Sequence, residues 1–173
     1  MTLTICRDEA GPAIVVTRRA ASLRAHSRQW ALPGGRTDQG ESAVEGALRE
    51  LREEVGLTAT AADVMGLLDD YETRSGYVIT PVVVWSDASW QELQPNPGEV
   101  DEIHPFPFKE LARRDSPILE TIAESDREVL SMHFHHDRIF APTGAMLYQF
   151  REVVMFGRQT RVAHFDQPRF AWR

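Results

Sequence analysis

The chain has 173 residues, of which 42% are hydrophobic and 26% are charged, and this balance excludes a disordered or fibrous protein. Its one cysteine, Cys6, excludes an internal disulfide, and its net charge of −7 argues against nonspecific binding to nucleic acid or to an anionic membrane. No apolar stretch approaches the ~18 residues of a membrane span, and the first residues show no secretion signal. We therefore expect one globular domain in the cytoplasm, with no nucleic-acid or membrane partner.

β-rich runs bounded by glycine, proline, aspartate or serine indicate strands. They cover residues 2–6, 13–17, 64–71, 77–85 and 162–172. Pro81 lies inside the fourth run and has no backbone N–H for sheet pairing, so we expect that strand to be irregular.

Three other segments carry apolar residues every three or four positions, which indicates helices. They cover residues 42–55, 117–132 and 144–156. The first is the best defined, because Gly56 follows it as a C-terminal stop. This order of strands and helices, without repeats or a linker, predicts one α/β domain over residues 1–173.

Acidic residues crowd the first predicted helix. At ~100° per residue, Glu50, Glu53 and Glu54 fall within one arc of the helix surface. Like charges at this spacing weaken a helix by a few tenths of a kcal/mol per pair, so stability alone does not favour them. A divalent cation such as Mg²⁺ would offset the repulsion and would suit a substrate that carries phosphates. The alternative interpretation is an ordinary solvated acidic face.

Two further residues of this helix point to a ligand. Gly46 lies in the same arc, and we expect its missing side chain to leave room for a ligand. Arg49 is spaced to reach Glu53, but the cation stands on the N-terminal side, which is the less favourable order for helix stability. We therefore expect Arg49 to orient a ligand.

The complete pattern resembles the Nudix box at every position. Its fixed residues are Gly35, Glu41, Arg49, Glu50, Leu51, Glu53, Glu54, Gly56 and Leu57. An accidental match of such a pattern at a given start has a probability on the order of 10⁻⁹. The resemblance implies a Nudix fold, which is an α/β/α sandwich with a mixed β-sheet, in a single Nudix hydrolase domain. It also implies hydrolysis of a nucleoside diphosphate linked to another group.

The segment before the box resembles the signature of coenzyme A diphosphatases. The matching residues are Thr17, Arg19, Ala20, Arg24, Pro33, Gly34 and Gly35, while Arg28 replaces a glycine and Leu32 replaces a phenylalanine. Residues 79–83, 95–100 and 106–111 also resemble this subfamily. The resemblance implies that coenzyme A or an acyl-CoA is hydrolysed to 3′,5′-ADP and (acyl-)phosphopantetheine.

The resemblance further implies Mg²⁺ or Mn²⁺ as cofactor. Its expected ligands are Glu50 and Glu54, followed by Glu53 and the carbonyl of Gly34. Glu99, in the segment Pro-Asn-Pro-Gly-Glu, and Glu53 are alternative candidates for the general base.

Three arginines are expected to bind the substrate. A guanidinium can bind phosphate through two hydrogen bonds, and coenzyme A carries a diphosphate and a separate 3′-phosphate. Arg19 and Arg24 match the signature, and Arg28 would add a cation in place of the glycine. The alternative for these residues is an ordinary surface position.

Two other functions stay open. One is a Nudix hydrolase of ADP-ribose or another nucleoside diphosphate derivative, because the box does not select what lies beyond the diphosphate. The other is a non-catalytic Nudix domain that binds a nucleotide, for which we would expect losses among the box glutamates. The sequence leaves the oligomeric state open, with a homodimer as one option.

Overall fold

A computed structural model describes residues 1–23 and 27–172. The chain divides into two compact units, which are described separately below. Unit 1 comprises Met1–Leu67 and Pro81–Phe108, and unit 2 comprises Leu68–Thr80 and Lys109–Arg173. A single Nudix domain over the whole chain stays a prediction.

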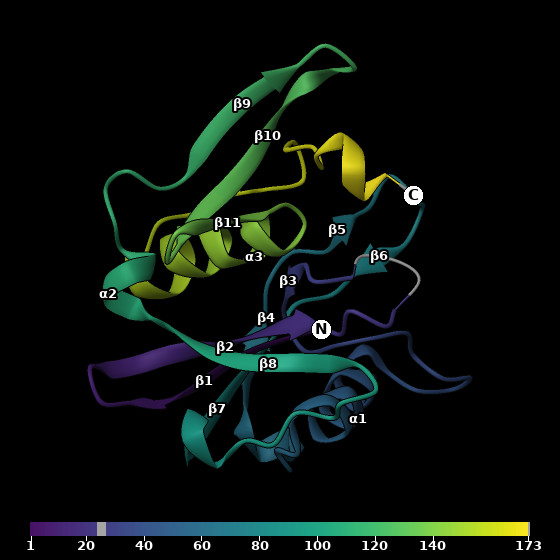
Figure 1. Cartoon of the computed structure of the whole chain (residues 1–173), viewed down its shortest axis with the longest axis vertical. Coiled ribbons are helices and arrows are strands. Elements are labelled where there is room, and N and C mark those ends of the chain that lie inside the picture. Colours follow the sequence, from purple (N-terminus) through teal and green to yellow (C-terminus); the bar gives the residue numbers. More distant parts are fainter. Residues whose placement is uncertain (24–26, 173) are drawn as a thin grey trace. The chain divides into compact units, whose positions relative to one another are not determined.

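Unit 1 is built on a six-stranded sheet with the order β3-β2-β1-β7-β4, in which β8 also pairs with β2 (Figure 1). Its strands are β1 (Thr2–Asp8), β2 (Gly11–Arg19), β3 (Trp30–Ala31), β4 (Val64–Leu67), β7 (Val82–Ser89) and β8 (Val100–Pro107). β1 and β7 are parallel, whereas the other neighbours are antiparallel. The expected mixed sheet of an α/β fold is therefore confirmed.

The helix α1 (Ala43–Val55) confirms the best-defined helix prediction. Ser42 caps its first turn: the Ser42 hydroxyl accepts the N–H of Glu45, and the Glu45 carboxylate accepts the N–H of Ser42. Gly56 ends the helix with a φ of 71°, in the left-handed region that favours glycine. Unit 1 also contains short 3₁₀ helices at Ala61–Asp63 and Trp90–Glu92.

An apolar face attaches α1 to the sheet. Ala47, Leu51 and Val55 pack against Val82 and Val84 of β7, and all five side chains are buried. Full burial of a leucine or valine side chain contributes about 1.5–3 kcal/mol. This packing fixes the rotation of α1, and with it the directions of the glutamates along the helix.

Unit 2 contains two small sheets and the helix α3. The elements are β5 (Tyr71–Glu72), β6 (Val78–Ile79), β9 (Ile118–Ile122), β10 (Ser125–Phe134), β11 (Asp137–Phe140) and α3 (Thr143–Phe150), with a π-helix at Arg151–Met155 and a 3₁₀ helix at Arg169–Ala171. The short helix α2 (Phe108–Leu111) spans the boundary between the units. Within the described residues, no helix combines the length and the apolar character needed to cross a membrane.

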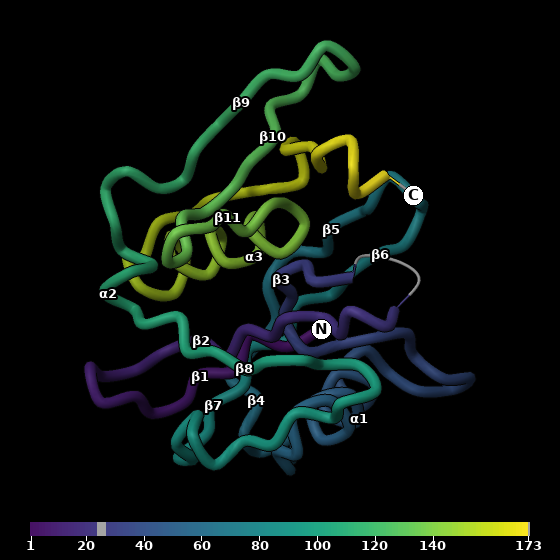
Figure 2. The backbone as a smooth tube through the Cα atoms, in the orientation of Figure 1, coloured from purple at the N-terminus to yellow at the C-terminus, as the bar shows by residue number. Residues whose placement is uncertain are grey.

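The predicted helix over residues 117–132 is wrong. This segment forms the antiparallel hairpin of β9 and β10, whose long, extended backbone is visible in Figure 2. Ile118, Thr121 and Ile122 are β-branched, which favours a strand. Val129 to Met132 are buried without interruption, as in a strand that is covered on both faces.

The predicted strand over residues 162–172 is also wrong. Turns and the 3₁₀ helix at Arg169–Ala171 replace it. The buried carboxylate of Asp166 accepts hydrogen bonds from Arg74 Nε at 2.9 Å and Ser125 Oγ at 2.5 Å. These side-chain contacts and one isolated parallel bridge between Asp166 and Val129 hold the segment in place of a strand.

Two predicted strands are each divided in the structure. The run over residues 64–71 gives β4 and β5, and the run over 77–85 gives β6 and β7. The second break falls at Thr80 and Pro81, which confirms the expected irregularity. The helix predicted over 144–156 is confirmed by α3 and the π-helix that continues it.

Candidate active site

Three carboxylates of unit 1 lie together. Glu50 and Glu54 stand one turn apart on α1, and Glu99 lies in the loop that precedes β8. One oxygen atom from each lies within 4.8 Å of the other two. Among residues 1–23 and 27–172, these are the side chains grouped closely enough to share a metal ion.

Glu54 is the buried member of this cluster, with 4% of its surface exposed. The pKa of its carboxyl is raised to about 7, mainly by burial and to a lesser extent by the charges of Glu50 and Glu99. The N–H of Gly34 and the charge of Arg19 oppose this rise, and the Gly34 hydrogen bond to Oε2 measures 3.1 Å. The structure thus shows Gly34 holding Glu54 through its N–H, while a role for the Gly34 carbonyl stays a prediction.

Glu50 depends on the glycine that opens the box. A Cβ atom on Gly35 would lie 2.3 Å from Glu50 Oε1, closer than two non-bonded atoms normally approach. A side chain at position 35 would therefore displace the Glu50 carboxylate, and glycine leaves the space that it occupies. Sequence spacing could not predict this role of Gly35, because the approach joins residues fifteen positions apart and depends on tertiary structure.

Arg49 connects the box glutamates. Its guanidinium binds Glu41 through Nε at 3.0 Å and Nη2 at 3.1 Å, and Nη1 donates to Glu50 at 2.9 Å and to Glu53 at 3.0 Å. Nη2 also donates to the carbonyl of Arg36 at 2.8 Å. In this structure Arg49 orients protein carboxylates, and its expected role toward a ligand would act through them.

The expectation for Gly46 is corrected by its surroundings. A Cβ atom there would lie 2.9 Å from Glu41 Oε2 and 2.9 Å from Thr37 Cγ2. Gly46 therefore makes room for the Glu41 carboxylate that holds Arg49, and not for a ligand. Sequence spacing placed Gly46 in the right arc, but it could not show that a neighbouring side chain fills the space.

Glu53 lies outside the three-carboxylate cluster. Its side chain is 44% exposed and accepts its hydrogen bond from Arg49. Glu50, Glu53 and Glu54 share an arc of α1 as the helical spacing predicts, but the third carboxylate within 4.8 Å is Glu99. The loop before β8 supplies it, and helical spacing alone could not reveal that approach.

The three predicted substrate-binding arginines differ in what the structure shows. Arg19 ends β2, its charge acts on Glu54, and its buried Nε has no hydrogen-bond partner within residues 1–23 and 27–172. Arg28 is exposed and has a φ of 59°, so an arginine adopts the left-handed conformation for which the related signature has glycine. Arg24 lies outside the described residues.

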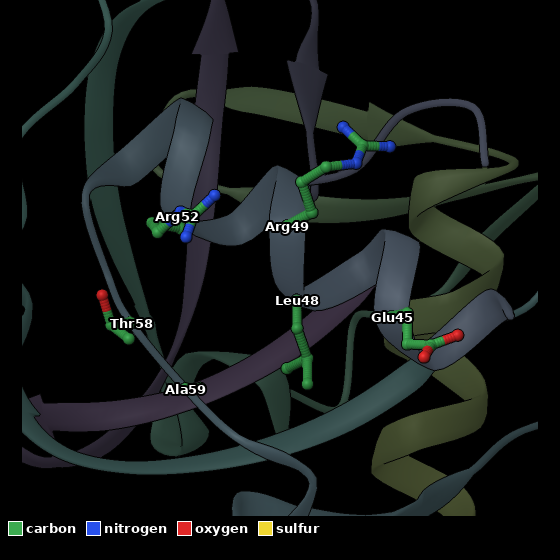
Figure 3. A pocket seen from close by; sticks show the side chains of 6 residues that line it. All are labelled: Glu45, Leu48, Arg49, Arg52, Thr58 and Ala59. Carbon is green, nitrogen blue, oxygen red and sulfur yellow. The ribbon is translucent and has the colours of Figure 1, made fainter. Parts of the chain in front are cut away.

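A depression of about 270 Å³ borders α1 but does not include the carboxylate cluster. Its lining residues are Glu45, Leu48, Arg49, Arg52, Thr58 and Ala59 (Figure 3). Figure 3 shows the Arg49 guanidinium pointing away from Leu48 and Ala59, and its hydrogen bonds go to the box glutamates. The groups suited to chemistry therefore lie in the cluster.

The donor set of the cluster fits a hard divalent cation. Mg²⁺ and Mn²⁺ favour carboxylate, carbonyl and water oxygens, and Mg²⁺ is commonly shared between one or two carboxylates and substrate phosphates. Glu50, Glu54 and Glu99 supply such oxygens at mutual distances within 4.8 Å. A bound cation would also offset the repulsion that contributes to the raised pKa of Glu54.

Sequence comparisons identify the family. The profile of the NUDIX domain matches residues 2–131. A relative named Uncharacterized Nudix hydrolase NudL, from Pectobacterium atrosepticum, is 34% identical over 142 residues, which cover 80% of this chain and 73% of the relative. The protein of the same name from Yersinia enterocolitica is 45% identical over 80 residues, covering 46% of this chain and 40% of the relative.

Solved structures agree on the fold. A MutT/nudix family protein from Enterococcus faecalis has a TM-score of 0.61 at 20% identity and covers 89% of this chain and 60% of its own. The Nudix hydrolase RenU from M. Smegmatis has a TM-score of 0.57 at 21% identity and covers 92% of this chain and 86% of its own. The Nudix fold, the complete box from Gly35 to Leu57 and the profile match together show that the chain belongs to the Nudix hydrolase family.

Proposed function

We propose that this Nudix hydrolase splits the diphosphate of coenzyme A or an acyl-CoA, releasing 3′,5′-ADP and (acyl-)phosphopantetheine. The observation that carries the proposal is the convergence of Glu50, Glu54 and Glu99 near the charge of Arg19. The coenzyme A specificity is supported by the signature residues before the box and by residues 95–100, which contain Glu99.

In this proposal, Glu50, Glu54 and Glu99 hold Mg²⁺ or Mn²⁺, and the Gly34 carbonyl is a further candidate donor. When bound, the cation neutralises the diphosphate and lowers the pKa of an attacking water. Arg49 keeps Glu50 and Glu53 in place through its hydrogen bonds.

Arg19 binds a phosphate oxygen of the substrate. Its buried Nε has no hydrogen-bond partner among the residues that the structure describes, so a ligand oxygen would satisfy it. Arg24 and Arg28 provide two further cations for a substrate with three phosphate groups. A guanidinium at each position would add charge-assisted hydrogen bonds, which are stronger than neutral ones.

Hydrolysis requires one proton acceptor. The water oxygen bonds to a phosphorus of the diphosphate, the bridging P–O bond breaks, and the proton of the water passes to a carboxylate. Glu53 and Glu99 are the two candidates: Glu99 belongs to the cluster, whereas Glu53 is held beside it by Arg49. A base at Glu53 would leave all three clustered carboxylates free to act as ligands.

A substrate panel tests this proposal. Free coenzyme A, acyl-CoAs, ADP-ribose and NADH are incubated with the protein and Mg²⁺ or Mn²⁺, and the products are identified by mass. The proposal predicts the highest kcat/KM for coenzyme A or an acyl-CoA, with 3′,5′-ADP among the products. Preference for ADP-ribose would support the hydrolase activity but reject coenzyme A as its substrate. Absence of turnover across the panel would favour a non-catalytic nucleotide-binding domain.

A further inference from the structure

The segment from Gln94 to Val100 is attached to the C-terminal end of α1. The N–H of Gln94 donates to the carbonyl of Val55 at 3.0 Å, and the N–H of Asn96 donates to the carbonyl of Glu54 at 2.9 Å. The last carbonyls of a helix have no partner within the helix, so these contacts satisfy two of them. Asn96 is thus bonded to the main chain of Glu54, whose side chain belongs to the carboxylate cluster.

Asn96 also forms the turn that carries Glu99. Its Oδ1 accepts the N–H of Gly98 at 3.2 Å, and its carbonyl accepts the N–H groups of Glu99 at 2.9 Å and Val100 at 2.8 Å. Asparagine commonly folds turns through such local hydrogen bonds. Pro97 restricts the backbone of Asn96 further, because a residue before proline is confined to extended conformations. The main-chain carbonyl of Asn96 thus binds Glu99 directly, and its side chain closes the turn at Gly98, one residue before Glu99.

The other side of the turn is attached to β2. The N–H of Ala20 donates to the carbonyl of Glu99 at 2.9 Å, and the N–H of Ala21 donates to Asp101 Oδ2 at 3.0 Å. Ala20 directly follows Arg19. Hydrogen bonds thus connect the end of α1, the turn at Asn96, Glu99 and the end of β2 in one continuous series.

We infer that Asn96 is a positioning residue that holds the Glu99 carboxylate against Glu54 and Glu50, so that the three can bind a divalent cation; this rests on the proposed function. The carboxylates repel one another, and a turn without its side-chain acceptor would let Glu99 move away. The neutral amide of Asn96 supplies that acceptor without adding a fourth negative charge beside the cluster.

Binding of Mn²⁺ alone tests the inference without substrate. Free Mn²⁺ is measured by electron paramagnetic resonance during titration of the wild type, Asn96→Ala, Glu99→Gln and the double variant. We expect Asn96→Ala and Glu99→Gln each to lower Mn²⁺ affinity about tenfold or more. Because Asn96 acts through Glu99, adding Asn96→Ala to Glu99→Gln should cause little further loss.

Two variants separate positioning from general stability. Ser42→Ala removes the cap at the other end of α1, so it should lower the unfolding midpoint without changing Mn²⁺ affinity. Asn96→Asp keeps the side-chain acceptor and should retain affinity within about threefold of the wild type. If Asn96→Ala does not fold, Asn96→Ser, a weaker acceptor, should give an affinity between those of the wild type and Glu99→Gln.

Three results would overturn the inference: wild-type affinity in Asn96→Ala, additive losses in the double variant, or wild-type affinity in Glu99→Gln. Failure of the proposed function is a separate observation. A wild type that binds Mn²⁺ with the expected dependence on Asn96, but hydrolyses no substrate of the panel, would reject the enzyme activity and retain the positioning role.

Discussion

The main-chain N–H of Gly34 donates a hydrogen bond of 3.1 Å to Oε2 of Glu54. This contact stabilises the charged form of a buried carboxylate and opposes the effects, chiefly burial, that raise its pKa to about 7. It also places Pro-Gly-Gly, the last part of the signature before α1, directly at the carboxylate cluster. The end of this signature and the glutamates of α1 therefore meet at Glu54.

Glu54→Gln and Glu50→Gln should each lower kcat by orders of magnitude while the fold is retained, because each removes the charge of a proposed metal ligand without changing its volume. Glu9→Gln, at an exposed position, is the control. Steady-state kinetics at saturating Mg²⁺ and circular dichroism provide the measurements. Near wild-type turnover in either cluster variant would contradict the ligand assignment.

Arg49→Lys should lower kcat roughly 10- to 100-fold, the usual range for a residue that orients metal ligands. A lysine keeps the charge but loses the planar fork that binds Glu41 twice and reaches Glu50 and Glu53. Arg52→Lys, at an exposed position of the same helix, should leave kcat unchanged. Equal kinetics in both variants would show that the Arg49 contacts are not needed for catalysis.

Arg19→Ala should reduce kcat/KM for coenzyme A about ten- to a hundredfold, the equivalent of a charge-assisted hydrogen bond of about 1.5–3 kcal/mol. Arg18→Ala is a close control, because Arg18 is the neighbouring residue on β2 and pairs with Glu102 instead. The comparison is made with coenzyme A and ADP-ribose. An unchanged preference between these substrates would reject a role of Arg19 in specificity.

Arg28→Gly should raise the free energy of unfolding by about 0.5–1 kcal/mol, because glycine adopts the left-handed conformation at φ 59° without the steric cost that arginine bears. The same variant should raise KM for coenzyme A if the guanidinium binds phosphate. Denaturant unfolding measures the first effect, and a loss of stability would show that side-chain contacts of Arg28 outweigh its backbone strain.

Asp166 should make unit 2 sensitive to acid. Hydrogen bonds from the Arg74 guanidinium hold the pKa of this carboxyl well below its ordinary value of 3.8, despite burial. Because the folded-state pKa is the lower one, the stabilisation is present above pH 4 and is lost as the pH falls through the folded-state value. Between pH 7 and pH 2, the midpoint of thermal unfolding should fall less steeply in Asp166→Asn than in the wild type. The same pH dependence in both proteins would reject this contribution of Asp166.

The sequence predicted α1 and the residues that it carries well, because both are local. Ser42, Gly56 and the apolar spacing determine where the helix lies, and the box residues determine what it carries. The helix prediction over residues 117–132 is wrong because the spacing of the apolar residues there is compatible with a helix and with a strand. The pairing of β10 with β9 and β11 selects the strand.

Long-range contacts also account for the parts of the site that spacing could not predict. Glu99 joins Glu50 and Glu54 through hydrogen bonds of Asn96 and Ala20, residues that belong to different elements. Gly46 was assigned to a ligand because the sequence does not show that Glu41 folds back toward it. In each case the missing information was a tertiary contact.

Glu50, Glu54 and Glu99 are proposed to hold the divalent cation together. Anomalous diffraction from crystals grown with Mn²⁺ would locate the ion relative to each of these side chains. We expect an ion bonded to carboxylate oxygens of all three glutamates, with Glu53 still hydrogen-bonded to Arg49. An ion bonded to Glu53 but not to Glu99, or no ion at this cluster at saturating Mn²⁺, would contradict it.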